Sequence, residues 1–346
     1  MQQIVYTNNI IGDVRAIIER ERPDRVVLLT DETTHRLCRP LVTEALADVP
    51  EIVIPATDVN KTLDTLQQVW CGLQDAGCTR HSLLINLGGG MVTDLGGFAA
   101  ATFKRGIRFV NIPTTLLSMV DAAVGGKTGI NFGGLKNEIG AFSDADAVII
   151  CTEFLRTLDA ENIRSGYAEM LKHSLLDGKE MLNRHMTFDL AQPDLVLLQQ
   201  MVRESIELKQ RVVTEDPHER GIRKALNLGH TVGHAFESFL MHKGSPVLHG
   251  YAVAWGLTVE LFMSSAQLAF PTGKMRQTMR FITAYYGRPN VTCDDYETLY
   301  TLMQHDKKNT AGHINFTLLG APGDIRLDQN VEKELIFDAL DFLREA

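Results

Sequence analysis

The chain has 346 residues, of which 22% are charged and 45% hydrophobic, and its formal net charge is -9 at pH 7. The length favours two domains, each with its own core. The acidic balance argues against a general nucleic-acid or anionic-membrane surface, so an anionic ligand would need local positive charge. No apolar run approaches the roughly 20 residues that span a bilayer, and the first residues lack the pattern of a signal peptide. The five cysteines form no CxxC pair, which predicts reduced thiols in a cytoplasmic protein.

Short apolar runs alternate with helical stretches over the first half of the chain. Residues 61–76, for example, carry leucines and a valine at helical spacing. Such alternation is typical of a parallel sheet covered by helices on both faces, and it predicts an α/β domain over residues 1–157. The runs that predict strands are RVVLLTD (25–31), EIVIP (51–55), SLLINLGGG (82–90), RFVNIP (108–113) and AVII (147–150).

The second half has a different pattern of apolar residues, because long segments of helical periodicity replace the short apolar runs. Only INFTLLG (314–320) resembles a strand. This pattern predicts a mainly α-helical domain over residues 158–346, with the active site in a cleft between the two halves. The periodic segments are 160–176, 193–213, 223–240, 250–268 and 332–343.

Three consecutive glycines, Gly88 to Gly90, lie between a predicted strand and a helix expected to begin near Met91. Glycines there let backbone N–H groups approach a phosphate at the start of a helix. The string departs from GxGxxG because Thr93 occupies the third glycine position. A dinucleotide site and an ordinary tight turn therefore both remain open. Asp31, at the end of the first strand, could likewise hold a ribose or cap a helix.

Titratable residues gather in the second half. Glu169 and Lys172 lie at i, i+3, which could be a surface ion pair or part of a site in a largely apolar helix. His230 and His234 lie at i, i+4, the spacing of helix-borne zinc ligands, although the sequence is not HExxH. His249 is a third candidate. Spacing alone does not decide which side chains bind a metal.

Several longer strings, taken together, resemble the 3-dehydroquinate synthase family of the sugar-phosphate cyclases. They occur in order over nearly the whole chain. They are GGGMVTDLGGFAAATFKRG (88–106), IPTTLLSMVDAAVGGKTGIN (112–131), LKNEIGAF (135–142), YAEMLKH (167–173), LNLGHTVGHAFE (226–237), HGYAVAWG (249–256) and DKKN (306–309).

The resemblance implies a Rossmann-like N-terminal domain, a helical C-terminal domain and an enzyme of the shikimate pathway. Members of this family convert 3-deoxy-D-arabino-heptulosonate 7-phosphate to 3-dehydroquinate and phosphate. They use NAD to oxidise C5 transiently, eliminate phosphate, reduce C5 again and close the ring by an intramolecular aldol reaction. The expected cofactors are NAD and a divalent metal, zinc or cobalt, and the expected assembly is a homodimer.

The resemblance also implies roles for individual residues. The metal ligands of the family correspond to Glu169, His230 and His249, and His234 corresponds to a residue of the substrate pocket. Expected catalytic residues are Lys127, Lys172, Lys209, Glu219, Arg223, Asn227 and His234. Expected substrate-binding residues are Arg105 (reaching the neighbouring subunit's site), Asp121, Lys136, Asn137 and Lys307. Expected NAD-binding residues are Asp31, Asp58, Lys61, Gly88, Gly89, Gly90, Asp94, Thr114, Thr115, Asp121, Lys127, Lys136 and Thr152.

These basic side chains would supply the local field that an acidic protein needs to hold a doubly anionic substrate. Lys127 and His234 are expected on the phosphate side and Arg223 at the carboxylate. Asp58 replaces the glutamate usual in the family. Three alternatives remain: another sugar-phosphate cyclase, a metal-dependent polyol dehydrogenase, and a non-catalytic NAD-binding regulator.

Overall fold

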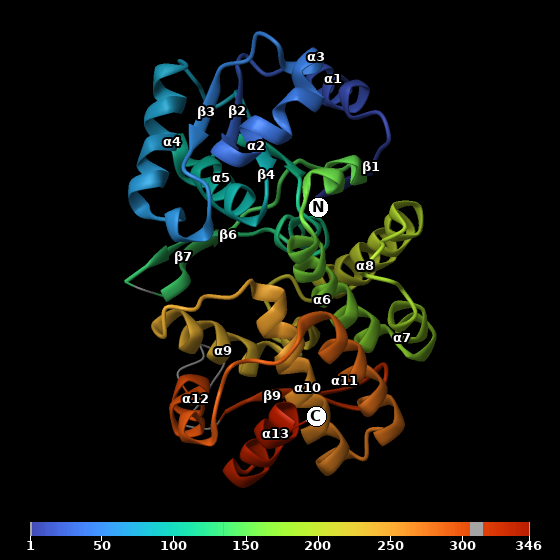
Figure 1. Ribbon diagram of the computed structural model, residues 1–346. Helices are drawn as coiled ribbons and strands as arrows, with labels where there is room; N and C mark the ends of the chain where they lie inside the picture. Colours follow the sequence, from blue (N-terminus) through green and yellow to red (C-terminus); the bar gives the residue numbers. More distant parts are fainter. Residues whose placement is uncertain (1, 134, 305–313, 346) are drawn as a thin grey trace. The chain divides into compact units, whose positions relative to one another are not determined.

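In the computed structural model, the described residues are 2–133, 135–304 and 314–345, and they form two compact units (Figure 1). The first unit is Met1–Asp159 and the second is Ala160–Ala346. Among the described residues, no helix is both long enough and apolar enough to cross a membrane. The expected cleft between the two halves stays a prediction.

A six-stranded parallel sheet forms the centre of the first unit, which confirms the predicted α/β fold. The strand order is β1-β8-β5-β4-β2-β3. All six residues of β4 are buried, as expected for a strand covered on both faces. Strand β1 was not predicted from the sequence. The strands are β1 (Gln3–Tyr6), β2 (Val26–Asp31), β3 (Glu51–Ile54), β4 (Leu83–Gly88), β5 (Arg108–Pro113) and β8 (Ala147–Ile150).

The helices of the first unit connect these strands. The helical segment between β2 and β3 is broken into three pieces, because Pro40 at the start of the middle piece cannot continue a preceding helix. The α-helices are α1 (Ile10–Glu21), α2 (Glu32–Leu37), α3 (Thr43–Leu46), α4 (Leu63–Asp75) and α5 (Gly90–Thr102). Short turns of 3-10 or π-helix are η1 (Arg39–Val42), η2 (Asp58–Asn60), η3 (Phe103–Arg105), η4 (Ser118–Ala122) and η5 (Thr152–Thr157).

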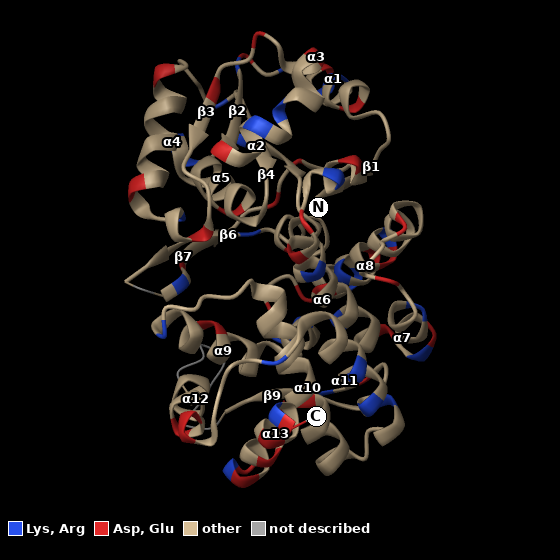
Figure 2. Cartoon of the chain, in the orientation of Figure 1, with Lys and Arg blue, Asp and Glu red and all other residues tan. Residues whose placement is uncertain are grey.

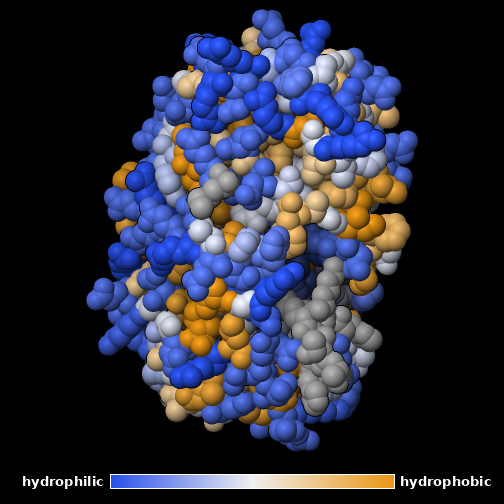
Figure 3. Space-filling view, turned by 180° about the vertical axis from the view of Figure 1, so that it is seen from behind, coloured by the Kyte–Doolittle hydropathy of each residue, from blue (hydrophilic) through white to orange (hydrophobic). Residues whose placement is uncertain are grey.

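A separate antiparallel hairpin, β6 (Lys127–Phe132) and β7 (Leu135–Phe142), was not predicted from the sequence. Asn131 ties it to the η2 turn, since its side chain donates to the Asp58 carbonyl at 2.9 Å. The hairpin carries exposed apolar side chains, and orange surface gathers on the corresponding side of Figure 3. These side chains are Phe132, Leu135, Ile139 and Phe142.

The second unit is mainly helical, as predicted, with one small antiparallel sheet. Helix α10 lies at its centre and packs against α6, α9, α11, α13 and β9. The helices are α6 (Ala160–Asp177), α7 (Lys179–Met186), α8 (Leu195–Glu215), α9 (His230–His242), α10 (His249–Leu268), α11 (Thr272–Tyr286), α12 (Tyr296–Gln304) and α13 (Lys333–Glu345). The 3-10 turns are η6 (Ile222–Asn227) and η7 (Cys293–Asp295), and the strands are β9 (Phe316–Ala321) and β10 (Asp324–Gln329).

The expected helix over 223–240 is wrong in its first third. Residues 222–227 form the 3-10 turn η6, Leu228 has an extended ψ of 127°, and Gly229 has φ 79°, so α9 begins only at His230. Gly229 adopts the left-handed conformation that favours glycine. His230 is therefore the first residue of its helix. Figure 2 shows acidic and basic residues interspersed within each unit, consistent with the moderate net charge.

Candidate active site

A carboxylate and two imidazoles converge inside the second unit. Glu169 lies in the middle of α6, His230 is the first residue of α9 and His249 is the first residue of α10. The Nε2 atoms of both histidines lie 3.4 Å from Oε1 of Glu169. The three ligand atoms lie within 4.8 Å of one another. One carboxylate oxygen and two imidazole nitrogens in this arrangement suit a transition metal such as zinc or cobalt.

The other ring nitrogens show which atoms can coordinate. Nδ1 of His230 lies 3.1 Å from the Leu228 carbonyl, and Nδ1 of His249 lies 3.0 Å from Oε2 of Glu237. Both partners are acceptors, so Nδ1 is the donor and the Nε2 lone pair of a neutral ring faces Glu169. Oε1 of Glu169 is buried with no hydrogen-bond partner among the described residues. Such an unsatisfied buried oxygen between two lone pairs fits a divalent cation.

The second oxygen of Glu169 is held by Lys172. Nζ of Lys172 donates to Oε2, and both side chains are buried. A surface ion pair, one of the two sequence-based readings, is therefore wrong. Burial alone would raise the pKa of Glu169, but Lys172 and His249 together lower it well below its usual range. Burial would lower the pKa of His249, but Glu237 and Glu169 raise it to about 10.

Close backbone contacts bring the three helices together. A Cβ on Gly250 would lie 1.9 Å from the Ser165 carbonyl oxygen, so this glycine lets α10 approach α6. A Cβ on Gly256 would lie 2.0 Å from the Gly229 carbonyl oxygen, so this glycine lets α10 approach the start of α9. Both values are far shorter than real Cβ contacts. The ligand-bearing helix ends are therefore positioned by shape as well as by hydrogen bonds.

A buried carboxylate completes the start of α9. Gly229 offers no capping side chain, and Glu260 of α10 instead accepts the Gly229 backbone N–H at 2.6 Å and that of Val232 at 3.4 Å. Glu260 is fully buried. It satisfies two of the N–H groups that a helix start leaves unpaired, and its negative charge suits that end of the helix dipole.

His234 lies beside the group formed by Glu169, His230 and His249, which we call the metal group, but is not a member of it. Its ring centroid is 5.3 Å from that of His230 and 6.1 Å from that of His249. The donor atoms of His234, Glu237 and His249 form a second, overlapping group within 4.8 Å. The i, i+4 pair His230 and His234 thus falls into two overlapping groups, and only His230 shares a group with Glu169.

The turn before α9 positions further expected site residues. Arg223 is buried and donates to the Pro217 carbonyl at 2.6 Å, while Asn227 donates to Glu219 at 2.7 Å. Asp216 holds the turn by accepting backbone N–H groups, including that of Arg223 at 3.1 Å. Lys209, on α8, is also buried. Arg223 and Lys209 are thus buried in the second unit, while Asn227 and Glu219 are half-buried.

In the first unit, several of the expected nucleotide residues lie at the carboxyl ends of parallel strands. After β2 the chain continues to β3 on one side, and after β4 it continues to β5 on the other side, which makes the carboxyl ends of β2 and β4 a topological switch point. Ligands of open parallel sheets bind at such points. Asp31 ends β2 and Gly88 ends β4, while Thr114 and Thr152 follow β5 and β8.

The glycine turn leads directly into α5. Gly89 and Gly90 are partly exposed, and no side chain caps this 13-residue helix. Packing also requires a glycine at position 88, because a Cβ on Gly88 would lie 2.5 Å from the Val92 side chain. After β5, the Thr114 hydroxyl is buried with no hydrogen-bond partner among the described residues. The bare helix start and this hydroxyl fit the phosphate and polar groups of a dinucleotide.

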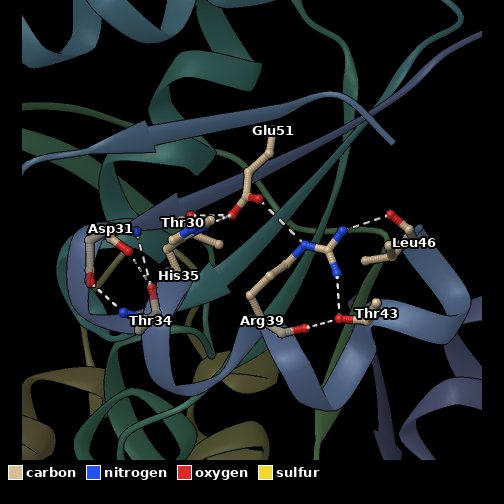
Figure 4. A network of polar contacts seen from close by, with 8 residues as sticks. All are labelled: Thr30, Asp31, Thr34, His35, Arg39, Thr43, Leu46 and Glu51. Carbon is tan, nitrogen blue, oxygen red and sulfur yellow. Dashed lines mark hydrogen bonds and ion pairs between the residues drawn. The ribbon is translucent and has the colours of Figure 1, made fainter. Parts of the chain in front are cut away.

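Asp31 acts as a helix cap in this structure. Its Oδ1 accepts the Thr34 backbone N–H at 2.8 Å, and Thr34 Oγ1 accepts the Asp31 backbone N–H at 3.0 Å. Figure 4 shows this capping box beside a second network, in which Glu51 faces Thr30 and Arg39. Capping and ribose binding use different faces of one carboxylate, so the cap does not exclude the expected role.

Charged residues of the expected cofactor and substrate sets form one network. Lys61 is buried and contacts Asp94 at 3.0 Å, Asp58 at 3.3 Å and Asn137 at 2.5 Å. Lys136 contacts Asp58 at 3.4 Å. Burial raises the pKa of Asp94 despite Lys61, whereas Lys61 and Lys136 outweigh burial and lower the pKa of Asp58. The shorter Asp58 therefore still reaches both lysines.

Three expected site residues have left-handed backbones, which side-chain-bearing residues seldom adopt. They are Arg105 (φ 69°), Asn137 (φ 52°) and Glu219 (φ 57°). Strain of this kind often accompanies functional sites. Among the other expected residues, Asp121 lies in the π-turn η4, Thr115 bonds to Ser118 at 2.9 Å, and Lys127 begins β6 and is exposed. Lys307 and Lys308 lie outside the described residues.

Sequence reasoning missed Glu237 and Glu260. Glu237 lies three residues after His234 in GHAFE, one helical turn along the same face, and this spacing could have suggested a contact. Glu260 gives no local signal, because its partners at 229 and 232 become neighbours only when α9 and α10 pack together.

Comparison with known proteins agrees with this geometry. Residues 51–165 match the model of the 3-dehydroquinate synthase N-terminal domain, and residues 166–309 match that of its C-terminal domain. The chain therefore belongs to the 3-dehydroquinate synthase family. A 3-dehydroquinate synthase from Parabacteroides distasonis is 50% identical, over all of this chain and 98% of the relative.

Solved relatives of the family have the same architecture. A 2-epi-5-epi-valiolone synthase from Streptomyces hygroscopicus subsp. jinggangensis, with NAD+ and Zn2+ bound, is 26% identical with a TM-score of 0.82; the match covers all of this chain and 97% of that one. A 2-deoxy-scyllo-inosose synthase complexed with carbaglucose-6-phosphate, NAD+ and Co2+ has a TM-score of 0.84. This match covers 97% of this chain and 95% of the other chain. Because the identity is only 20%, it shows a common fold and nothing more.

Proposed function

We infer that the chain is a lyase of the shikimate pathway that converts 3-deoxy-D-arabino-heptulosonate 7-phosphate to 3-dehydroquinate and phosphate. Family membership supports this activity directly. The observation that carries it is the convergence of Glu169, His230 and His249 on one point inside the second unit. A non-catalytic regulator would have no need to keep these three side chains together.

Glu169, His230 and His249 would hold the divalent metal, zinc or cobalt. When bound, the metal supplies a Lewis acid that polarises sugar hydroxyls. Lys172 keeps Glu169 ionised, and the Nδ1 hydrogen bonds turn both Nε2 lone pairs inward. Metal binding needs an ionised Glu169 and two neutral imidazoles, so His249, whose pKa is raised to about 10, would release its Nε2 proton as the metal binds.

NAD would be held by the first unit, residues 1–157, at the carboxyl ends of β2 and β4. When bound, NAD supplies reversible hydride transfer at C5 with no net redox change. The bare start of α5 would receive the pyrophosphate. The residues proposed for NAD are Asp31, Asp58, Lys61, Gly88, Gly89, Gly90, Asp94, Thr114, Thr115, Asp121, Lys127, Lys136 and Thr152.

The substrate would be oriented by charged residues, most of them in the second unit, residues 158–346. Arg223 would bind the carboxylate, because its guanidinium is buried and its backbone is fixed by Asp216. Lys127 and His234 would bind the phosphate, and a positioned phosphate can itself take the neighbouring proton as it leaves. Further proposed residues are Asp121, Lys136, Asn137, Lys172, Lys209, Glu219, Asn227 and Lys307.

Rival activities differ in what the pocket must recognise. Other sugar-phosphate cyclases share the metal and NAD but lack a substrate carboxylate, and a polyol dehydrogenase would have little use for buried Lys172, Lys209 and Arg223. A coupled phosphate assay with the heptulosonate phosphate separates them. We expect phosphate release that stops with a chelator and needs only catalytic NAD without accumulating NADH. Release that is unaffected by removing the metal would contradict the proposal.

We further propose a cytoplasmic homodimer in which Arg105 reaches the active site of a second copy. The exposed apolar side chains of the β6–β7 hairpin support self-association, and the strained backbone at Arg105 supports a functional role. Mixing Arg105→Ala with Lys209→Ala subunits tests this idea. Mixed dimers should regain activity that neither variant has alone, and an absence of regain would contradict it.

A further inference from the structure

A second carboxylate lies behind the metal group. Glu237, on the second turn of α9, is 7% exposed, and its Oε2 lies 3.0 Å from Nδ1 of His249. We propose that Glu237 is a positioning residue that fixes the tautomer and orientation of His249 and thereby strengthens divalent-metal binding. This inference rests on the proposed metal site of Glu169, His230 and His249.

The hydrogen bond determines which nitrogen of His249 can coordinate. A carboxylate oxygen only accepts, so the bond places the proton of a neutral ring on Nδ1. The lone pair is then on Nε2, which lies 3.4 Å from Oε1 of Glu169. Without Glu237, the ring could present either nitrogen or rotate away, because His249 is half-buried at the first position of its helix.

The two imidazoles of the group are held differently. The Nδ1 partner of His230 is the backbone carbonyl of Leu228, a neutral group that no substitution removes. The partner of His249 is an ionised side chain from another helix. A carboxylate that accepts the Nδ1 proton raises the basicity of the imidazole more than a neutral carbonyl does, and this strengthens the bond from Nε2 to a metal. We therefore expect metal affinity to depend on Glu237.

Glu237 also resolves a competition between two overlapping groups. His249 belongs both to the Glu169–His230–His249 group and to the group with His234 and Glu237. The hydrogen bond occupies Nδ1 of His249 and Oε2 of Glu237 together, so neither atom is available to a cation in the second group.

The test measures zinc affinity by competition with a chromophoric chelator on full-length apo-protein, without reference to turnover. Glu237→Ala should weaken zinc binding about 10- to 100-fold, and Glu237→Gln, which still accepts the Nδ1 proton without the charge, should weaken it less. The Co2+ absorption spectrum of Glu237→Ala should change in band position or intensity, since the ligand geometry changes. The melting temperature of each apo-variant reports folding separately.

Glu51→Gln is the matched control, because Glu51 also accepts from a histidine, with Nδ1 of His35 at 2.9 Å (Figure 4). It lies on β3 in the other unit and should leave zinc affinity unchanged. Unchanged affinity in both Glu237 variants, or a loss of apo-stability without a loss of affinity, would overturn the proposal. If Glu237→Ala does not fold, the affinity of Glu237→Gln decides.

His249→Ala separates this inference from the proposed function. If His249→Ala binds zinc as tightly as the unsubstituted chain, the metal site itself is wrong. If His249→Ala abolishes binding but both Glu237 variants bind normally, the site stands and only the positioning role of Glu237 fails.

Discussion

The two units build their candidate sites in different ways. In the first unit, the proposed nucleotide residues Asp31, Gly88 and Thr114 lie at or just after the ends of parallel strands, and the ion network includes half-exposed Asp58 and Lys136. In the second unit, the metal group lies on helices, with Glu169 and Lys172 fully buried. Water can replace a lost partner in the first network but not in the second. We therefore expect similar substitutions to reduce the free energy of unfolding more in the helical unit than in the first unit.

The largest effect is expected for Glu169→Ala. This substitution leaves the Lys172 ammonium buried without its carboxylate, and breaking such a pair costs about 3–5 kcal/mol. Urea denaturation of the metal-free protein measures the free energy of unfolding. The control is Glu297→Ala, which removes an exposed pair with Lys333 and should cost at most about 1 kcal/mol. Equal losses in the two variants would contradict the role of burial.

Gly250→Ala tests the close approach of α10 to α6. Its Cβ would lie 1.9 Å from the Ser165 carbonyl oxygen, so the helices must separate at a cost of about 1–3 kcal/mol. Zinc affinity should fall as well, because His249 and Glu169 move apart. Gly273→Ala on α11 is the control, since nothing lies within 4 Å of its Cβ. It should be neutral or stabilise by up to about 1 kcal/mol; destabilisation equal to that of Gly250→Ala would refute the steric argument.

Acid should destabilise the helical unit through His185. This side chain is fully buried, and its burial lowers the pKa to about 3. The unfolded chain takes up a proton below pH of about 6.5 while the folded chain does not, so stability is full above that pH and falls toward pH 3. The described histidines of the first unit, His35 and His81, are exposed.

His185→Leu removes this titration. Between pH 7.5 and pH 5, the unsubstituted chain should lose about 2 kcal/mol more unfolding free energy than the variant. Urea curves at the two pH values provide the measurement. Parallel losses in both proteins would show that other groups govern the acid response.

The smallest effect is expected in the first unit, for Lys61→Met. The substitution removes the partner of Asp94, but the Asp94 side chain is 17% exposed and keeps access to water. A cost of about 1 kcal/mol follows, at the low end for a stranded polar group. NAD affinity should weaken while zinc affinity stays unchanged. A stability loss as large as that of Glu169→Ala would erase the difference between the units.

The same contrast explains how much of the fold could be predicted. The strands of the parallel sheet are continuous apolar runs, so β2, β4 and β5 are evident in the sequence. The β6–β7 hairpin is not, because it is rich in glycine and charge and most of β7 is exposed. The break before α9 also escaped prediction, since periodicity continues through Leu228 and Gly229 while the backbone does not.

Residues of the candidate site that belong to sequence motifs could be predicted, whereas residues that reach the site only through helix packing could not. Family resemblance nominated Glu169, His230 and His249, and the structure brings them together. Spacing alone would have paired His230 with His234. The contacts of Glu237 and Glu260 join residues 12 and 31 positions apart, and such contacts depend on how helices pack.

Glu260 links the stability of two helices. Its carboxylate, carried by α10, accepts N–H groups at the start of α9, so α9 cannot form its first turn fully until α10 is in place. The two helices should open and close as one cooperative unit in hydrogen exchange, with the amides of Gly229 and Val232 protected as strongly as the centre of α10. Fraying, which is common at helix ends, would therefore be suppressed at the start of α9, where His230 is the first residue.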